Sequence, residues 1–124
     1  MKSISEEDVQ KAVDWLRDNA QECAKARATR IYLDEYRKSL KALLMSKYPD
    51  LPISGQERQA YAHDDYINHL KLLKDAIYED ERLRFFRASA EVKIEAWRTQ
   101  QEDELGPRMA SQECDCDFTT SGNT

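Results

Sequence analysis

Glycine and proline are scarce in this chain, with three of each among 124 residues. A β-sheet protein needs more of these residues for the turns between its strands. Charged residues are abundant instead and make up 35% of the sequence. This balance predicts an all-α protein, and the length has room for one domain.

Long apolar runs and a secretory signal are also missing. No stretch approaches the roughly 18 apolar residues of a membrane span, and the first eight residues turn acidic without an apolar segment. Cysteine occurs three times, an odd number, and Cys114 and Cys116 share a polar tail, which argues against a disulfide framework. We therefore expect a cytoplasmic protein that does not enter a membrane.

Charge is spread unevenly along the chain. Residues 102–124 hold six acidic residues against one arginine, a charge of −5 that equals the net charge of the whole chain. Residues 25–47 hold seven basic residues against two acidic ones, a local charge of +5. The sequence thus combines a basic segment with an acidic tail.

The first half of the chain predicts one long helix over about residues 6–47. Ser5 and Asp8 have the spacing of a capping box, and no glycine or proline follows until Pro49. Apolar residues recur at steps of three and four, the period of a helix. The expected stripe is Val9, Val13, Leu16, Ala20, Ala24, Ala28 and Ile31, then Tyr32, Tyr36, Leu40 and Leu43.

Two prolines, Pro49 and Pro52, break the pattern before a second helical region. Ser54 and Glu57 predict a capping box that opens a short helix over about residues 55–63. Asp64 or Asp65 is a further N-cap candidate, for a long helix over about residues 65–104 that Gly106 and Pro107 should end. Its expected stripe is Tyr66, Leu70, Leu73, Ile77, Leu83, Phe86, Ala90, Ile94 and Trp97. The step from Ile77 to Leu83 slips phase and leaves Asp80 or Glu81 near the seam.

Two long helices with a short connection predict an antiparallel helical hairpin, a domain of residues 1–105, followed by an acidic disordered tail of residues 106–124. One stripe per helix leaves other apolar residues partly exposed, so we expect oligomerisation. The residues expected to remain exposed are Trp15, Leu33, Leu44, Leu72 and Phe85. The expected oligomer interface comprises Ala20, Ala24, Ala28, Leu83, Phe86 and Trp97.

Sequence signatures of catalysis or of a metal site are not found. His63 and His69 are six residues apart, which does not place them on one helix face, and we interpret them as solvated. Cys114 and Cys116 lack the C-x₂₋₄-C spacing and the second pair of a metal site, so free thiols are the simpler interpretation. We expect no enzyme activity, no cofactor and no metal.

The basic segment allows two interpretations. Cations near tyrosines suit single-stranded nucleic acid, because phosphates need cations and bases stack on aromatic rings. The candidate DNA-binding residues are Lys25, Arg27, Arg30, Tyr32, Arg37, Lys38 and Lys41. Alternatively, these cations pair with acidic residues across the hairpin or an oligomer interface, namely Glu79, Asp80, Glu81, Glu91 and Glu95.

The order of features resembles small helical proteins of phage and prophage recombination modules, and is similar to UvsY-type recombination mediators. The resemblance lies in Lys25-Ala26-Arg27 with Tyr32, in Glu57, Ala60, Ala62 and Asp65-Tyr66, and in the segment 90–99 with Trp97-Arg98. That family forms rings of helical subunits that bind single-stranded DNA and load a recombinase onto strands covered by single-strand-binding protein. The resemblance implies the same partners here, in the cytoplasm of a bacterial host.

The leading hypothesis is therefore an accessory protein of DNA recombination or replication, acting as an oligomer of helical hairpins. A second hypothesis is an acidic inhibitor of a host nuclease that uses the tail and the segment Glu79-Asp80-Glu81. A third is a purely structural helical assembly module.

Overall fold

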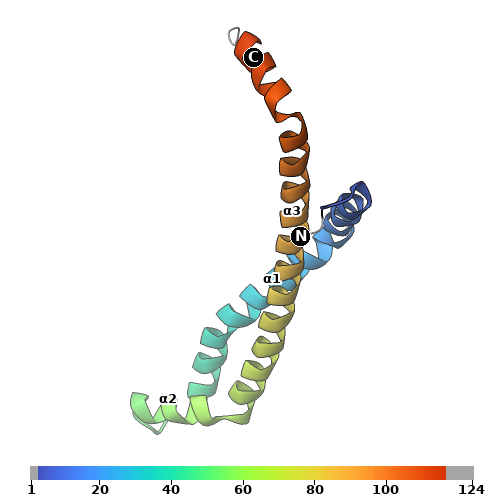
Figure 1. The fold of residues 1–124 in the computed structure, drawn as a ribbon. Helices are drawn as coiled ribbons and strands as arrows, with labels where there is room; N and C mark the ends of the chain where they lie inside the picture. The colour runs from blue at the N-terminus through green and yellow to red at the C-terminus, as the bar shows by residue number, and fades with distance from the viewer. Residues whose placement is uncertain (1–2, 117–124) are drawn as a thin grey trace. The chain divides into compact units, whose positions relative to one another are not determined.

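The computed structural model describes residues 3–116, and it describes side chains over residues 3–105. The described residues form three helices and no strand: α1 (Glu6–Met45), α2 (Ile53–Ala62) and α3 (Asp64–Cys116) (Figure 1). The all-α prediction is confirmed. The two long helices begin within a residue of the predicted positions.

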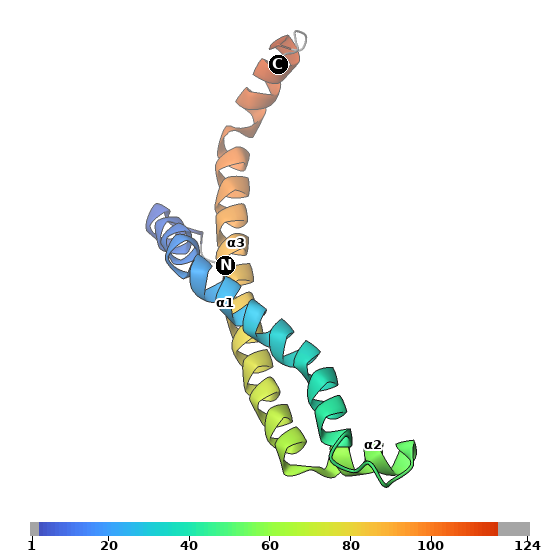
Figure 2. The same ribbon diagram turned by 180° about the vertical axis from the view of Figure 1, so that it is seen from behind.

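The described residues divide into two compact units. Unit 1 contains the residues up to Asp18 and those from Arg87 onward, and unit 2 contains Asn19–Phe86. In unit 2 the second part of α1 and the first part of α3 lie side by side, with α2 between them in sequence (Figures 1 and 2). Each unit thus pairs one part of α1 with one part of α3.

The start of α1 follows the predicted capping box. The backbone N–H of Asp8 donates to Ser5 Oγ at 3.1 Å, and the N–H of Ser5 donates to Asp8 Oδ2 at 3.2 Å. Each bond satisfies a backbone donor that the first turn of a helix leaves without a partner. The hydrogen bonds from Ser5 lower the pKa of the Asp8 carboxyl.

The starts of α2 and α3 differ from the prediction. Pro52 precedes α2 and no side chain caps it, so the capping box of Ser54 and Glu57 is wrong; Glu57 binds Lys41 on α1 instead, at 2.9 Å. At the start of α3 it is His63 Nδ1 that accepts the N–H of Asp65, at 3.0 Å. The side chain that caps the start of α3 is therefore that of His63 and not that of Asp64 or Asp65, the predicted N-cap candidates.

The end of α3 also differs, because the helix continues through Gly106 and Pro107 to Cys116. A proline has a helical φ angle and removes one backbone donor, so it weakens a helix without always ending it. The residues that follow include the good helix formers Met109, Ala110 and Glu113. The predicted end at Glu104 is wrong, and the rest of the predicted tail, residues 117–124, lies outside the described residues.

The buried and half-buried side chains of each long helix include a series of residues at steps of three and four. On α1 they are Ala12, Leu16, Asn19, Cys23, Ala26, Arg30, Leu33, Arg37, Leu40 and Leu44. On α3 they are Tyr66, His69, Leu73, Ala76, Asp80 and Leu83 in unit 2, and Ala90, Ile94 and Trp97 in unit 1. This spacing averages 3.5 residues, the heptad period of coiled coils.

The predicted stripes are therefore only partly correct. Ala20, Ala24 and Ala28 follow one another at four residues, and each such step turns about 40° further round the helix, so all three are exposed. Leu44, expected to be exposed, is the most deeply buried large side chain, at 2% exposure. The prediction that Asp80 or Glu81 lies near the seam is confirmed, because Asp80 occupies a buried position of the heptad.

The core of unit 2 lies where the two long helices meet α2. Leu44, Ala60 and Tyr66 form a buried cluster, against which Leu40 and Met45 pack. Farther along, His69 Nε2 donates to the Leu33 carbonyl at 2.7 Å, because a carbonyl oxygen can only accept a hydrogen bond. The prediction of a solvated His69 is wrong, because His69 is 7% exposed.

Unit 1 packs with smaller groups. Ala12 and Ala90 are its buried hydrophobic residues among those described. Gln100 exchanges two hydrogen bonds with the backbone of Ile4, both at 3.0 Å. The indole Nε1 of Trp97 is buried and has no hydrogen-bond partner in the described part of the chain.

Candidate functional site

The basic segment of α1 provides the predicted DNA-binding residues. Among them, Arg30 contacts two carboxylates of α3. Its guanidinium donates to Asp80 Oδ2 at 3.1 Å and to Glu81 Oε2 at 2.8 Å. The Asp80 side chain is 10% exposed and that of Arg30 36%. The hydrogen bonds to Glu81 and Asp80 raise the pKa of Arg30, and Arg30 lowers the pKa of Glu81.

Arg37 and Lys41 also have partners within unit 2. Arg37 lies 2.9 Å from Asp34. It also donates a hydrogen bond to Tyr66, and this bond contributes most to the raised pKa of Arg37. Lys41 Nζ lies 2.9 Å from Glu57 and 4.9 Å from the centre of the Tyr61 ring on α2. Arg37 therefore links α1 to α3, and Lys41 links α1 to α2.

The remaining candidates lie at the surface. Lys38 pairs with Glu35 at 3.5 Å, and both side chains are largely exposed. Lys25 and Arg27 are exposed and form no ion pair within the described residues. Tyr32 is 64% exposed and stacks on Tyr36, with ring centres 5.9 Å apart.

Lys25 and Arg27 do not share one site. Lys25 lines a shallow hollow of about 190 Å³ together with Glu22, Ala26, Thr29, Ala76 and Glu79. Arg27 lines a different hollow of about 470 Å³, together with Arg30, Ile31, Asp34, Asp80, Glu81 and Arg84. Lys25 and Tyr32, seven residues apart, lie on the same face of α1.

Some residues of the predicted oligomer interface are buried within the chain, and others are exposed. Leu83 is 5% exposed within its own chain, and Trp97 is half-buried in unit 1. Phe86 is 51% exposed, and the three alanines at positions 20, 24 and 28 are exposed but small. Of the six residues, Phe86 offers the largest accessible apolar group.

Tyr78 and Phe85 are the exposed aromatic residues of α3 that the predicted interface omits, at 69% and 67% exposure. Arg84 lies over the Phe85 ring at 5.9 Å and Arg82 over the Phe86 ring at 5.7 Å. Tyr78 and Phe85 are seven residues apart in the sequence, a spacing that keeps both on one face of the helix. This spacing is the signal from which the sequence could have identified them.

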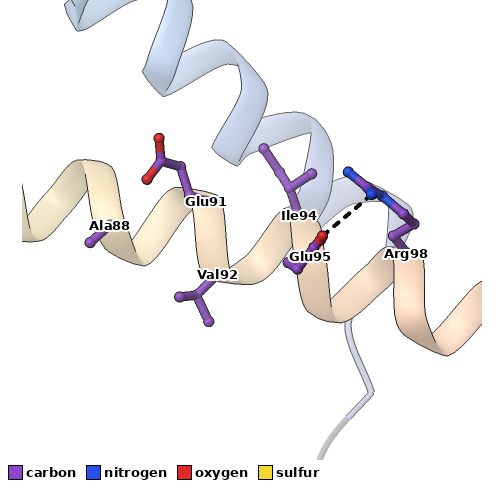
Figure 3. A pocket seen from close by; sticks show the side chains of 6 residues that line it. All are labelled: Ala88, Glu91, Val92, Ile94, Glu95 and Arg98. Carbon is purple, nitrogen blue, oxygen red and sulfur yellow. Dashed lines mark ion pairs between the residues drawn. The ribbon is translucent and has the colours of Figure 1, made fainter.

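Unit 1 carries a hollow of about 500 Å³ along α3 (Figure 3). Ala88, Val92 and Ile94 supply its apolar wall, and Glu91, Glu95 and Arg98 supply its polar edge. Glu95 and Arg98 form an ion pair at 3.4 Å, drawn as a dashed line in Figure 3. The hollow is open and shallow, with the carboxylates of Glu91 and Glu95 at its edge.

Metal-binding groups do not gather in the described part of the chain, where no cluster of three or more His, Cys, Asp or Glu side chains is present. Cys23 is half-buried and free, and the side chains of Cys114 and Cys116 lie outside those described. Within residues 3–116, no helix combines the length and the apolar character that a membrane crossing requires.

Comparison with known proteins gives no relative: no family model matches this chain, and no curated protein or solved structure is significantly similar to it.

Proposed function

We propose that this protein is a helical assembly module that acts by binding other protein surfaces, its own copies among them. The observation that carries the proposal is the distribution of apolar side chains. Among the described residues seven hydrophobic side chains are buried, three of them alanines, whereas sixteen large hydrophobic side chains are exposed. Exposed apolar side chains that form contiguous patches mark protein-interaction sites.

Several of these side chains lie in unit 2. Ile31, Tyr32, Leu72, Tyr78 and Phe85 are each at least half exposed. Two helical segments with one shared seam bury too little apolar area to offset the entropy of ordering their residues. A partner that covers the outer faces supplies the missing burial.

Light scattering coupled to size-exclusion chromatography, repeated over a wide concentration range, tests this function. We expect a defined oligomer whose mass falls on dilution, because apolar contacts drive the association. Added salt should change the oligomer little. A monodisperse monomer at every concentration contradicts self-assembly.

A second candidate is the DNA accessory function that the resemblance to UvsY-type mediators implies, in which the oligomer contacts single-stranded DNA, a recombinase or single-strand-binding protein. One observation favours it: Lys25 and the exposed Tyr32 ring share a face of α1, and phosphates and bases require these two kinds of group. Arg30, Arg37 and Lys41 support it less, because carboxylates of the same unit hold them.

Filter binding of labelled single-stranded DNA tests the second candidate. Lys25→Ala/Tyr32→Ala should weaken binding at least about tenfold, from one lost phosphate contact and one lost stacked base. The matched control is Lys47→Ala/Tyr61→Ala, which also removes one lysine and one exposed tyrosine from unit 2. Equal loss in both variants, or no binding by the wild type, rejects this surface as a DNA site.

The inhibitor hypothesis has less support from the acidic segment of α3. Glu79 pairs with Arg82 at 2.7 Å, and Asp80 and Glu81 bind Arg30. These carboxylates are already engaged inside unit 2, which leaves less negative charge available for an enzyme.

A further inference from the structure

One flank of α3 in unit 2 combines exposed apolar side chains with lysines. We name it the Lys74 face, because its other members lie three, four or seven residues from Lys74 and so share one side of the helix. The exposure of its apolar side chains runs from 37% for Ile77 to 69% for Tyr78. Both of its lysines are exposed and form no ion pair among the described residues. The Lys74 face comprises Ile67, Leu70, Lys71, Lys74, Ile77 and Tyr78.

The charge of the Lys74 face is positive, and no free carboxylate on the same side of the helix cancels it. Asp75 follows Lys74 and therefore lies about 100° further round the helix. Glu81, seven residues after Lys74, is held by Arg30 at 2.8 Å and by Arg84 at 3.2 Å. The face thus repels the same face of another copy, and it suits a segment that carries carboxylates beside an apolar side chain.

A segment of this kind lies later on α3, in unit 1. We name it the Glu102 segment and define it as Glu102, Asp103, Glu104 and Leu105. Its three carboxylate side chains are exposed and form no ion pair among the described residues, and Leu105 is 44% exposed. It begins the stretch 102–124, whose charge of −5 equals the net charge of the whole chain.

We infer that the Lys74 face binds the Glu102 segment of a second copy. This inference rests on the proposed assembly function and names the surface and its occupant. Opposite charge selects this occupant, because the chain itself carries unpaired carboxylates that match the unpaired lysines. The contact uses two different surfaces of each copy, so it can repeat beyond two copies.

The apolar and the charged groups have different roles in this contact. Burial of Leu70, Ile77 and Tyr78 against Leu105 drives association, whereas the lysines select the partner surface. Ion pairs that water can reach contribute little free energy, so added salt should change the oligomer little. Like charges brought together by this apolar contact are far less tolerable.

Charge reversal tests the contact directly. Lys71→Glu/Lys74→Glu places carboxylates against the Glu102 segment, and Glu102→Lys/Asp103→Lys/Glu104→Lys places ammonium groups against the Lys74 face. Each variant alone should raise the dissociation constant, measured by light scattering over a range of concentrations, more than about tenfold. All five substitutions in one chain restore opposite charges and should recover most of the lost affinity.

The matched control is Lys25→Glu/Lys47→Glu. It changes the net charge as much as the reversal of the two face lysines does, at two exposed lysines of unit 2 outside the Lys74 face. It should leave the dissociation constant unchanged. Circular dichroism of every variant should show wild-type helix content, because the substituted side chains are exposed. If the chain with all five substitutions associates no better than the separate reversals, the inference is wrong.

Leu70→Ser tests the apolar part of the contact without changing charge. It should weaken association about tenfold, because it removes a leucine that the contact buries. Leu72→Ser is its control, since Leu72 is 58% exposed on the same helix but lies outside the Lys74 face. Equal effects of the two serine variants contradict the inference.

The outcomes separate this inference from the assembly function. A wild-type monomer at all concentrations overturns the assembly function itself. A wild-type oligomer that neither the charge reversals nor Leu70→Ser disturb leaves the assembly function intact and overturns this surface alone. If Lys71→Glu/Lys74→Glu keeps the oligomer but loses single-stranded DNA in filter binding, nucleic acid occupies the face and the inference is wrong.

Discussion

Units 1 and 2 pair segments of the same two helices, yet they achieve their packing by different means. Unit 2 has a third helix, three buried leucines and an ion pair with a buried carboxylate, together with His69 bound to a backbone carbonyl. Unit 1 has two buried alanines, two hydrogen bonds from one glutamine and a buried indole N–H without a partner among the described residues. The comparison indicates that unit 2 is the more stable part of the chain, since apolar burial supplies most of the stability of a fold.

Leu44→Ala is the strongest test of this difference. The side chain is 2% exposed and packs with Ala60 and Tyr66, so its truncation removes buried methyl groups and leaves a cavity. We expect a loss of about 2–4 kcal/mol in the free energy of unfolding, measured by urea denaturation. A loss below about 1 kcal/mol contradicts the assignment of the main core to this cluster.

Asp80→Ala should have the next largest effect. It leaves Arg30 with Glu81 as its remaining acidic partner and removes a buried carboxylate that the fold has already desolvated. We expect a smaller loss than for Leu44→Ala, whereas Arg30→Met/Asp80→Leu should be neutral or stabilising, because apolar residues can replace a buried ion pair. A double variant less stable than Asp80→Ala rejects this account.

Gln100→Ala should act on unit 1 with a smaller effect. It removes both hydrogen bonds to the backbone of Ile4, at a cost of about 1 kcal/mol. Hydrogen exchange followed by mass spectrometry should show faster exchange in the first turns of α1 and unchanged exchange around Leu44. Faster exchange throughout unit 2 contradicts the separation of the two units.

Acidification should give the smallest effect. Hydrogen bonds from Arg30 lower the pKa of Glu81 in the folded chain below its ordinary value of 4.5, so the unfolded chain binds the proton first. The stabilisation is complete above about pH 4.5 and is lost as the pH falls through the lower, folded pKa. Urea denaturation at several pH values should show this loss, and Glu81→Gln should reduce its slope.

The sequence predicted the helices better than it predicted their contacts. Ser5 and Asp8 carried a local signal, and the structure forms that capping box. The seam was predicted only in part, because polar residues occupy several of its positions, among them Asn19, Arg30, Arg37, His69 and Asp80. A search for apolar residues passes over such positions and selects Ala20, Ala24 and Ala28, which are exposed. Spacing placed Asp80 or Glu81 near the seam, but it does not reveal which basic residue is the partner of Asp80, because Arg30 lies fifty residues away in sequence.

The ion pair of Arg30 with Asp80 also restricts how α1 and α3 can slide past each other in unit 2. A slip of one heptad either way brings Leu73 or Arg87 to the position of Asp80. The first leaves the Arg30 guanidinium beside a leucine, and the second places two guanidiniums together; both leave a carboxylate desolvated without its partner. The ion pair thus gives α1 and α3 a single favourable alignment in unit 2.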